Sequence, residues 1–83
     1  MPEKKVMVVI QSPQGEQQFT FNETTKVSEV IETARKAFGY QPGNFVLKLE
    51  KNNVTLAPER TLVSYHIQEG DLLLLVPETG SGV

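Results

Sequence analysis

The stretch that decides the fold is residues 61–76, TLVSYHIQEGDLLLLV, close to the end of the 83-residue chain. Within it, Gly70 and Asp71 stand directly before four consecutive leucines. Glycine tolerates backbone angles that other residues avoid, and an aspartate side chain can hydrogen-bond its own backbone in a turn. A short apolar run bounded by a turn is typical of a buried strand. The segment therefore predicts a compact turn that leads into the last strand of a sheet.

The beginning of the chain predicts a hairpin. Residues 5–11 are almost continuously apolar, and residues 16–22 alternate between apolar and polar positions. Both patterns are typical of strands. Residues 12–15, Ser-Pro-Gln-Gly, have the composition of a tight turn between them. Phe19 and Phe21 are expected to face inward, and the first strand is expected to carry one set of apolar side chains on each face: Val6, Val8 and Ile10 on one, Met7 and Val9 on the other.

The clearest helical pattern covers residues 27–38. Apolar side chains recur at helical spacing along one stripe, at Val27, Val30, Ile31, Ala34 and Phe38. A single stripe of this kind predicts an amphipathic helix that packs one face onto the sheet. We expect Thr25 or Ser28 to cap its N-terminus and Gly39 to end it in a left-handed conformation.

The rest of the chain supplies further strands. Side chains of residues 44–50 alternate between two faces, which predicts a strand. Residues 54–56 are expected to form a short strand and residues 62–67 a compact turn or 3₁₀ segment. Residues 72–76 are expected to form the final strand. A hairpin, a crossover helix and further strands indicate the α+β class. We expect a mixed four- to five-stranded sheet with one helix on one face, in the order ββαββ. Residues 1–77 are assigned to this domain and residues 78–83 to a flexible C-terminal tail.

Composition excludes several functional classes. The chain contains no cysteine, has a formal net charge of −2 and carries its basic residues scattered along the sequence. A disulfide framework is therefore ruled out, and the basic stripe of a nucleic-acid-binding protein is missing. No apolar run approaches the roughly 18 residues of a membrane span. We expect a cytoplasmic monomer that binds no nucleic acid, membrane, cofactor or metal.

Catalytic residues are hard to find in this sequence. His66 is the single histidine, and a general base needs a positioned partner and a cleft. Glu29 and Glu32 share one side of the predicted helix, but no histidine or aspartate accompanies them at metal-binding spacing. The sequence therefore predicts a protein that is not an enzyme.

Several motifs carry a resemblance to a known family. Residues 61–68 and the pattern Tyr-x-Ile-x-x-Gly-Asp-x-Leu-x-Leu, which begins at Tyr65, are similar to the end of ubiquitin. Weaker similarity includes Lys26-Val27, residues 39–42 and Leu47, and extends over nearly the whole chain. The chain thus resembles the ubiquitin-like β-grasp family, and its helix resembles prokaryotic members. The resemblance implies that the Tyr65 ring is buried and its hydroxyl hydrogen-bonds the backbone of the preceding loop.

The tail carries the functional expectation. In ubiquitin-like modifiers and sulfur carriers an activating enzyme adenylates a C-terminal glycine, and here Gly80 and Gly82 stand in place of the usual diglycine. By this resemblance we expect a small protein modifier whose acyl group is transferred from Gly82 or Gly80. Its partners would be an activating enzyme, a conjugating enzyme, a processing peptidase and the target proteins.

A second expectation concerns the face of the sheet opposite the helix. If Leu72 and Leu74 point toward the helix, strand alternation sends Leu73 and Leu75 to the other face. Family register places three further residues beside them. The expected partner-binding surface is Val9, Val46, Lys48, Leu73 and Leu75.

Two alternative functions stay open. One is a non-covalent protein-interaction module similar to the small ubiquitin-like protein of bacterial type VII secretion, which works through its surface and not through its tail. The other is a sulfur carrier, which Gly70 and Asp71 favour and the missing diglycine opposes.

Overall fold

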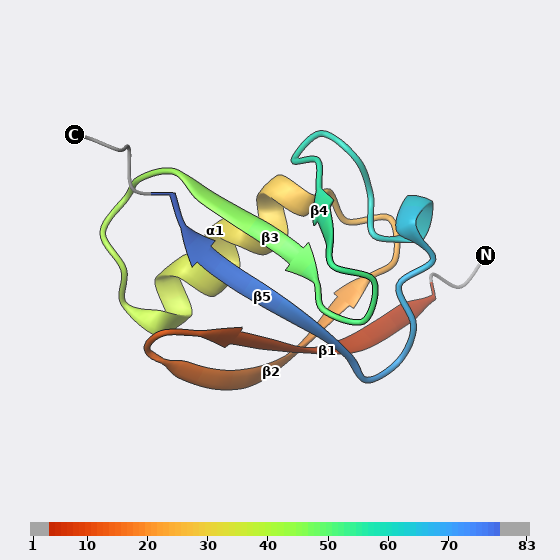
Figure 1. Ribbon diagram of the computed structural model, residues 1–83. Helices are drawn as coiled ribbons and strands as arrows, with labels where there is room; N and C mark the ends of the chain where they lie inside the picture. Colours follow the sequence, from red (N-terminus) through yellow and green to blue (C-terminus); the bar gives the residue numbers. More distant parts are fainter. Residues whose placement is uncertain (1–3, 79–83) are drawn as a thin grey trace.

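The computed structural model describes residues 4–78 and shows five strands and one α-helix (Figure 1). The elements, in chain order, are β1 (Lys5–Ser12), β2 (Gly15–Asn22), α1 (Val27–Phe38), β3 (Phe45–Leu49), β4 (Val54–Leu56), the short 3₁₀ helix η1 (Val63–Tyr65) and β5 (Asp71–Pro77). The expected α+β fold, a hairpin, a helix and further strands in one sheet, is confirmed, and three strands follow the helix.

One mixed sheet contains all five strands, in the spatial order β2-β1-β5-β3-β4. β5 lies at its centre, parallel to β1 and antiparallel to β3. The hairpin β1–β2 and the pair β3–β4 complete the two sides. Figure 1 shows α1 crossing behind this sheet, which leaves the face toward the viewer without a helix. The fold is therefore α+β with one covered and one uncovered sheet face.

The helix has the expected bounds but a different N-terminal cap. Gly39 ends it with φ 83°, in the predicted left-handed conformation. The N-cap is Lys26, whose backbone is extended and whose side chain makes no capping bond, so the prediction of Thr25 or Ser28 is wrong. Instead, the N–H groups of Val27 and Ser28 donate to carbonyls of the loop before η1, at Arg60 and Pro58. Tertiary contacts thus satisfy the orphan donors that a side chain normally caps.

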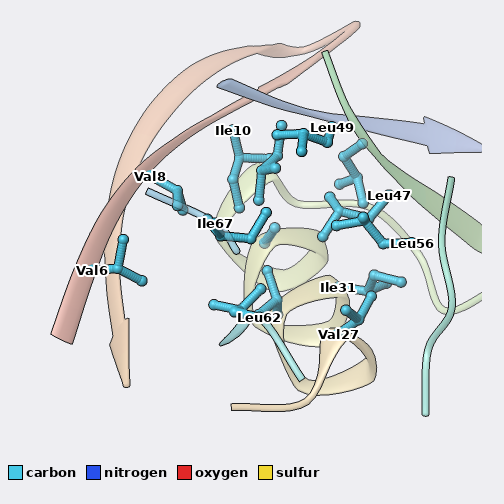
Figure 2. Close-up of a cluster of buried hydrophobic side chains, with 14 residues drawn as sticks. Val6, Val8, Ile10, Val27, Ile31, Leu47, Leu49, Leu56, Leu62 and Ile67 are labelled. Atoms are coloured by element: carbon cyan, nitrogen blue, oxygen red, sulfur yellow. The ribbon is translucent and has the colours of Figure 1, made fainter. Parts of the chain in front are cut away.

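The hydrophobic core lies between the sheet and α1 (Figure 2). Its buried side chains come from α1 and from every strand except β2, together with Leu62 and Ile67 on either side of η1. They are Val6, Val8, Ile10, Val27, Val30, Ile31, Ala34, Leu47, Leu49, Leu56, Leu62, Ile67, Leu73 and Leu75. Phe19 and Phe21 of β2 pack against this cluster while remaining half-exposed.

The prediction for the two faces of β5 is wrong. Leu73 and Leu75 are buried, with 0% and 1% of their surface exposed, so they lie in the core and not on a docking face. The reason is strand register: Leu73 pairs with Ile10 of β1, and pairs on adjacent strands share a face. Because Ile10 faces the helix, Leu73 must do so as well. In a run of four leucines, alternation does not say which two side chains face the helix. Pairing with the neighbouring strands decides this.

The turn before β5 has the expected hydrogen bonds, although the Tyr65 ring is partly buried and not fully buried as expected. The Ala57 N–H donates to the Tyr65 hydroxyl at 2.8 Å, which ties the ring to the preceding loop. Gly70 has φ 83°, in the left-handed region that glycine tolerates best. The Asp71 carboxylate accepts a hydrogen bond from the Gln68 N–H at 2.8 Å. These contacts fix the position at which β5 enters the sheet.

Candidate interaction surface

The uncovered sheet face carries an apolar strip across its three central strands. We call the strip the outer face. Alternation places its members opposite the core residues of the same strands. They are Met7 and Val9 of β1, Leu72, Leu74 and Val76 of β5, and Val46 and Lys48 of β3.

Strand register makes the outer face contiguous. Val9 pairs with Leu72 across the parallel β1–β5 junction. On the other side of β5, Leu74 pairs with Lys48 and Val76 pairs with Val46. Neighbouring strands lie about 4.8 Å apart, so paired side chains on one face touch. The result is a continuous surface and not a set of scattered residues.

Burial within the outer face is graded. Six of its seven side chains are half-buried by their neighbours, and Val76 is 40% exposed. Lys48 is the single charged member of the set, and it pairs with Leu74 of β5 on one side and with Thr55 of β4 on the other. One end of the strip is polar: Lys51 Nζ lies 3.5 Å from Asp71 Oδ2, and Glu69 Oε1 accepts a hydrogen bond from the Met7 N–H. The outer face is thus an apolar surface with one ammonium group on its border strand, β3.

The expected surface residues fall into two groups. Val9, Val46 and Lys48 do share the outer face, although their role in binding stays a prediction. Leu73 and Leu75 leave the set because they are buried. Sequence reasoning missed the remaining members: Met7, Leu72, Leu74 and Val76.

The tail glycines Gly80 and Gly82 lie outside the described residues. The prediction of acyl transfer at these positions therefore has no structural test, and the same holds for the domain boundary at residue 77.

Other chemistry in the described part of the chain is sparse. His66 is exposed at the end of η1, beside Glu23, Glu69 and the basic residues Lys4 and Lys5. Within residues 4–78, no three histidine, aspartate or glutamate side chains converge as metal ligands would. No helix in that range is long and apolar enough to cross a membrane.

Comparison with known proteins identifies the fold. No protein-family model matches the chain. The human and mouse homologs of nuclear protein localization protein 4 are each 26% identical to it over 82 residues. The match covers 95% of this chain and only 14% of each relative. The chain thus spans about one seventh of the length of these curated relatives.

Two solved structures show the same architecture. A designed protein based on ubiquitin aligns with a TM-score of 0.78 and 22% identity, over 95% of this chain and 96% of that one. The ubiquitin-like domain of an Arabidopsis thaliana protein aligns with a TM-score of 0.78 and 17% identity, over 96% of this chain and 85% of that one. The chain therefore has the ubiquitin-like β-grasp fold. The relatives named above are mammalian, so the prediction of a prokaryotic type gains no support.

Proposed function

We propose that this ubiquitin-like domain is a non-covalent protein-interaction module that binds its partner through the outer face. The observation that carries the proposal is that two strands of the same sheet, β2 and β5, present side chains of different polarity on that one face. β2 exposes Glu16, Gln18 and Thr20 there, as a solvated antiparallel strand does. β5, two strands away, exposes Leu72 and Leu74.

Folding alone does not call for apolar residues at these outer positions. The core already receives Leu73 and Leu75 from β5, and the two intervening leucines point away from it. A polar residue at either outer position would keep the alternation typical of a half-solvated sheet. Contiguous apolar surface on a small monomeric domain commonly marks a site of protein interaction. Binding explains these leucines better than folding does.

The chemistry of the outer face restricts the partner. Lys48 lies between Leu74 of β5 and Thr55 of β4, so a partner that covers the strip as far as β3 must bury the lysine stem and meet its ammonium group. An unpaired charge is costly to bury, and an acidic group opposite Lys48 would remove that cost. We therefore infer a partner surface of apolar side chains with one carboxylate at its margin.

Crosslinking tests the proposal directly. A photoreactive benzoylphenylalanine at Val76 would be activated in cells of the source organism, and the same residue at Glu59, in the loop before η1, is the matched control. We expect discrete adducts from position 76 that fall when Lys48 is changed to Glu and are absent from position 59. Adducts of equal yield from both positions would contradict a specific outer-face site.

Covalent modification through the tail stays a separate prediction. It depends on Gly80 or Gly82, and the sulfur-carrier alternative depends on the same end of the chain. The similarity to one seventh of a much longer protein supports a module that acts as part of a larger chain.

Intact mass of the N-terminally tagged protein separates the three functions. Larger species with isopeptide-linked remnants would support the modifier, and replacement of one terminal oxygen by sulfur would support the carrier. Unmodified protein that retains its crosslinks after deletion of residues 80–83 is the result that we expect.

A further inference from the structure

A pocket lies at the end of the sheet where β1 begins. Its volume is about 480 Å³, and it is lined by the start of β1, by the residue that follows β2 and by the segment that contains η1. Figure 1 shows the start of β1 and η1 at the end of the molecule marked N, far from the end of β5. Of the described residues that line the pocket, none belongs to the outer face. The pocket is therefore a separate place on the molecule.

The pocket has an apolar floor. Val6 and Ile67 line it and are 5% and 9% exposed, so the floor is the margin of the hydrophobic core. Figure 2 shows Val6 at the border of the core cluster. Val63, which is 41% exposed, adds an apolar side chain from η1. A ligand in the pocket can thus bury an apolar side chain against the core.

The rest of the lining is largely charged. Five titratable side chains line the pocket: Lys4, Lys5, His66, Glu23 and Glu69. Glu69 is already engaged, because its Oε1 accepts a hydrogen bond from the Met7 N–H at 3.0 Å. No carboxylate of residues 4–78 forms a salt bridge with Lys4 or Lys5. The pocket therefore offers two ammonium groups and an imidazole to an anionic ligand.

Lys5 also has main-chain groups that the sheet does not use. The Met7 N–H donates to Glu69 Oε1 and the Met7 carbonyl accepts from the Gly70 N–H, so the main chain of Met7 faces away from β2. Alternate residues of a strand face the same way, which directs the N–H and carbonyl of Lys5 away from β2 as well. β5 first pairs with β1 at Val8, and no loop or turn bond within residues 4–78 ends at Lys5. Beside the pocket, β1 thus has one open donor and one open acceptor.

These features together favour the end of a peptide over a free anion. An inorganic anion would meet the ammonium groups but would use neither the apolar floor nor the main-chain acceptor of Lys5. An extended peptide can pair its own amide groups with an open strand segment, and proteins also capture terminal carboxylates with convergent donors. Hydrogen bonds from ammonium groups to a carboxylate are among the stronger ones.

We propose that this pocket binds the free C-terminus of an extended peptide. The terminal carboxylate meets the ammonium groups of Lys4 and Lys5, and the last side chain is aliphatic and packs on the apolar floor. The main chain before it pairs with the open groups of Lys5. Glu23, which is half-buried at the pocket wall, faces a basic side chain of the peptide.

Peptide titration followed by NMR of the full chain tests the proposal. The probe is acetyl-Ser-Arg-Ser-Leu with a free C-terminal carboxylate. We expect its binding to shift the amide signals of residues 4–6 and 66–69 and to leave those of Leu74 and Val76 unchanged. Hydrogen exchange of the Lys5 amide should slow when the peptide is bound, because the peptide supplies the acceptor that this amide lacks within residues 4–78.

Matched peptides separate the contributions. The same peptide with a C-terminal amide keeps every side chain and loses the negative charge, and it should bind about tenfold more weakly. Replacement of the terminal leucine by serine should also weaken binding about tenfold, since the apolar floor loses its partner.

Protein variants provide the second control. The double variant Lys4→Gln with Lys5→Gln should bind the carboxylate peptide about tenfold more weakly and should no longer distinguish it from the amide. Lys36→Gln removes a lysine of α1 that does not line the pocket, and it should leave the affinity unchanged.

Three outcomes would overturn the proposal. The amide peptide could bind as tightly as the carboxylate, or the shifts could map to the outer face. Deletion of residues 1–3 could also shift the pocket signals and strengthen peptide binding, in which case the chain's own preceding segment occupies the pocket.

Discussion

The inner and outer faces of β1, β5 and β3 have different roles. On the inner face, Ile10, Leu47 and Leu73 are completely buried beneath α1. On the outer face, Val9, Lys48 and Leu74 stand half-exposed with no helix over them. Both faces are largely apolar, yet packing accounts for only one of them. The difference teaches that the inner residues make the fold, while the outer residues need a functional explanation.

Removing a core leucine should have the largest effect. Leu73→Ala leaves a cavity beneath α1 and should lower the free energy of unfolding by about 2–5 kcal/mol. Leu72→Ala, one residue earlier on the outer face, should lower it by about 1 kcal/mol or less, because that side chain buries less surface. Urea denaturation of both variants measures the contrast. Equal losses would show that the two faces do not differ in this way.

The Tyr65 hydroxyl should have a smaller effect. Tyr65→Phe removes the acceptor of the Ala57 N–H and should lower the free energy of unfolding by about 1 kcal/mol. Tyr40→Phe is the matched control, because the buried Tyr40 hydroxyl has no hydrogen-bond partner within residues 4–78. Its loss should be neutral or slightly stabilising, as thermal denaturation of the two variants will show. A larger loss from Tyr40→Phe than from Tyr65→Phe contradicts this account.

Acid should reveal a still smaller contribution from α1. The hydrogen bond from Arg35 lowers the pKa of Glu32 below its ordinary value of 4.5, and the charges of Arg35 and Lys36 act in the same direction. A lowered pKa in the folded state means that the stabilisation is fully present above pH 4.5 and is lost as the pH falls through the folded pKa. When the pH is lowered through this range, the free energy of unfolding should therefore fall less in the Glu32→Gln variant than in the unaltered protein.

The control for this measurement is Glu59→Gln, which removes an exposed loop carboxylate. Its stability should depend on pH as that of the unaltered protein does. The urea concentrations at the unfolding midpoints, measured between pH 3 and 6, should show this to within about 0.1 M. A Glu32→Gln profile that also follows the unaltered protein would mean that the pair with Arg35 contributes nothing.

Most of the fold could be predicted from the sequence because its signals are local. The helical stripe of residues 27–38 and the turn at residues 12–15 each act within a few residues, and both have the expected bounds. The cap at Lys26 could not be predicted in this way. The first N–H groups of the helix donate to the carbonyls of Pro58 and Arg60, which lie far along the chain and reach the helix only after folding.

The candidate site was only partly predictable, for a related reason. The face of Val9, Val46 and Lys48 could be assigned from the register of the family that the chain resembles. The four leucines of β5 offer no contrast between neighbours, and their phase follows from pairing with Ile10 and Leu49 on neighbouring strands.

The central claim is that the outer face binds the partner. Its most direct test compares two double variants, one on the outer face of β5 and one on the inner face, whose substituted residues are shifted by one position. Each carries benzoylphenylalanine at Val76, and circular dichroism and crosslink yield are measured for both. Leu72→Asp with Leu74→Asp should keep the fold and lose the crosslinked partner, whereas Leu73→Asp with Leu75→Asp should unfold the domain. A folded outer-face variant that crosslinks as well as the unaltered protein would contradict the assignment of the outer face as the binding surface.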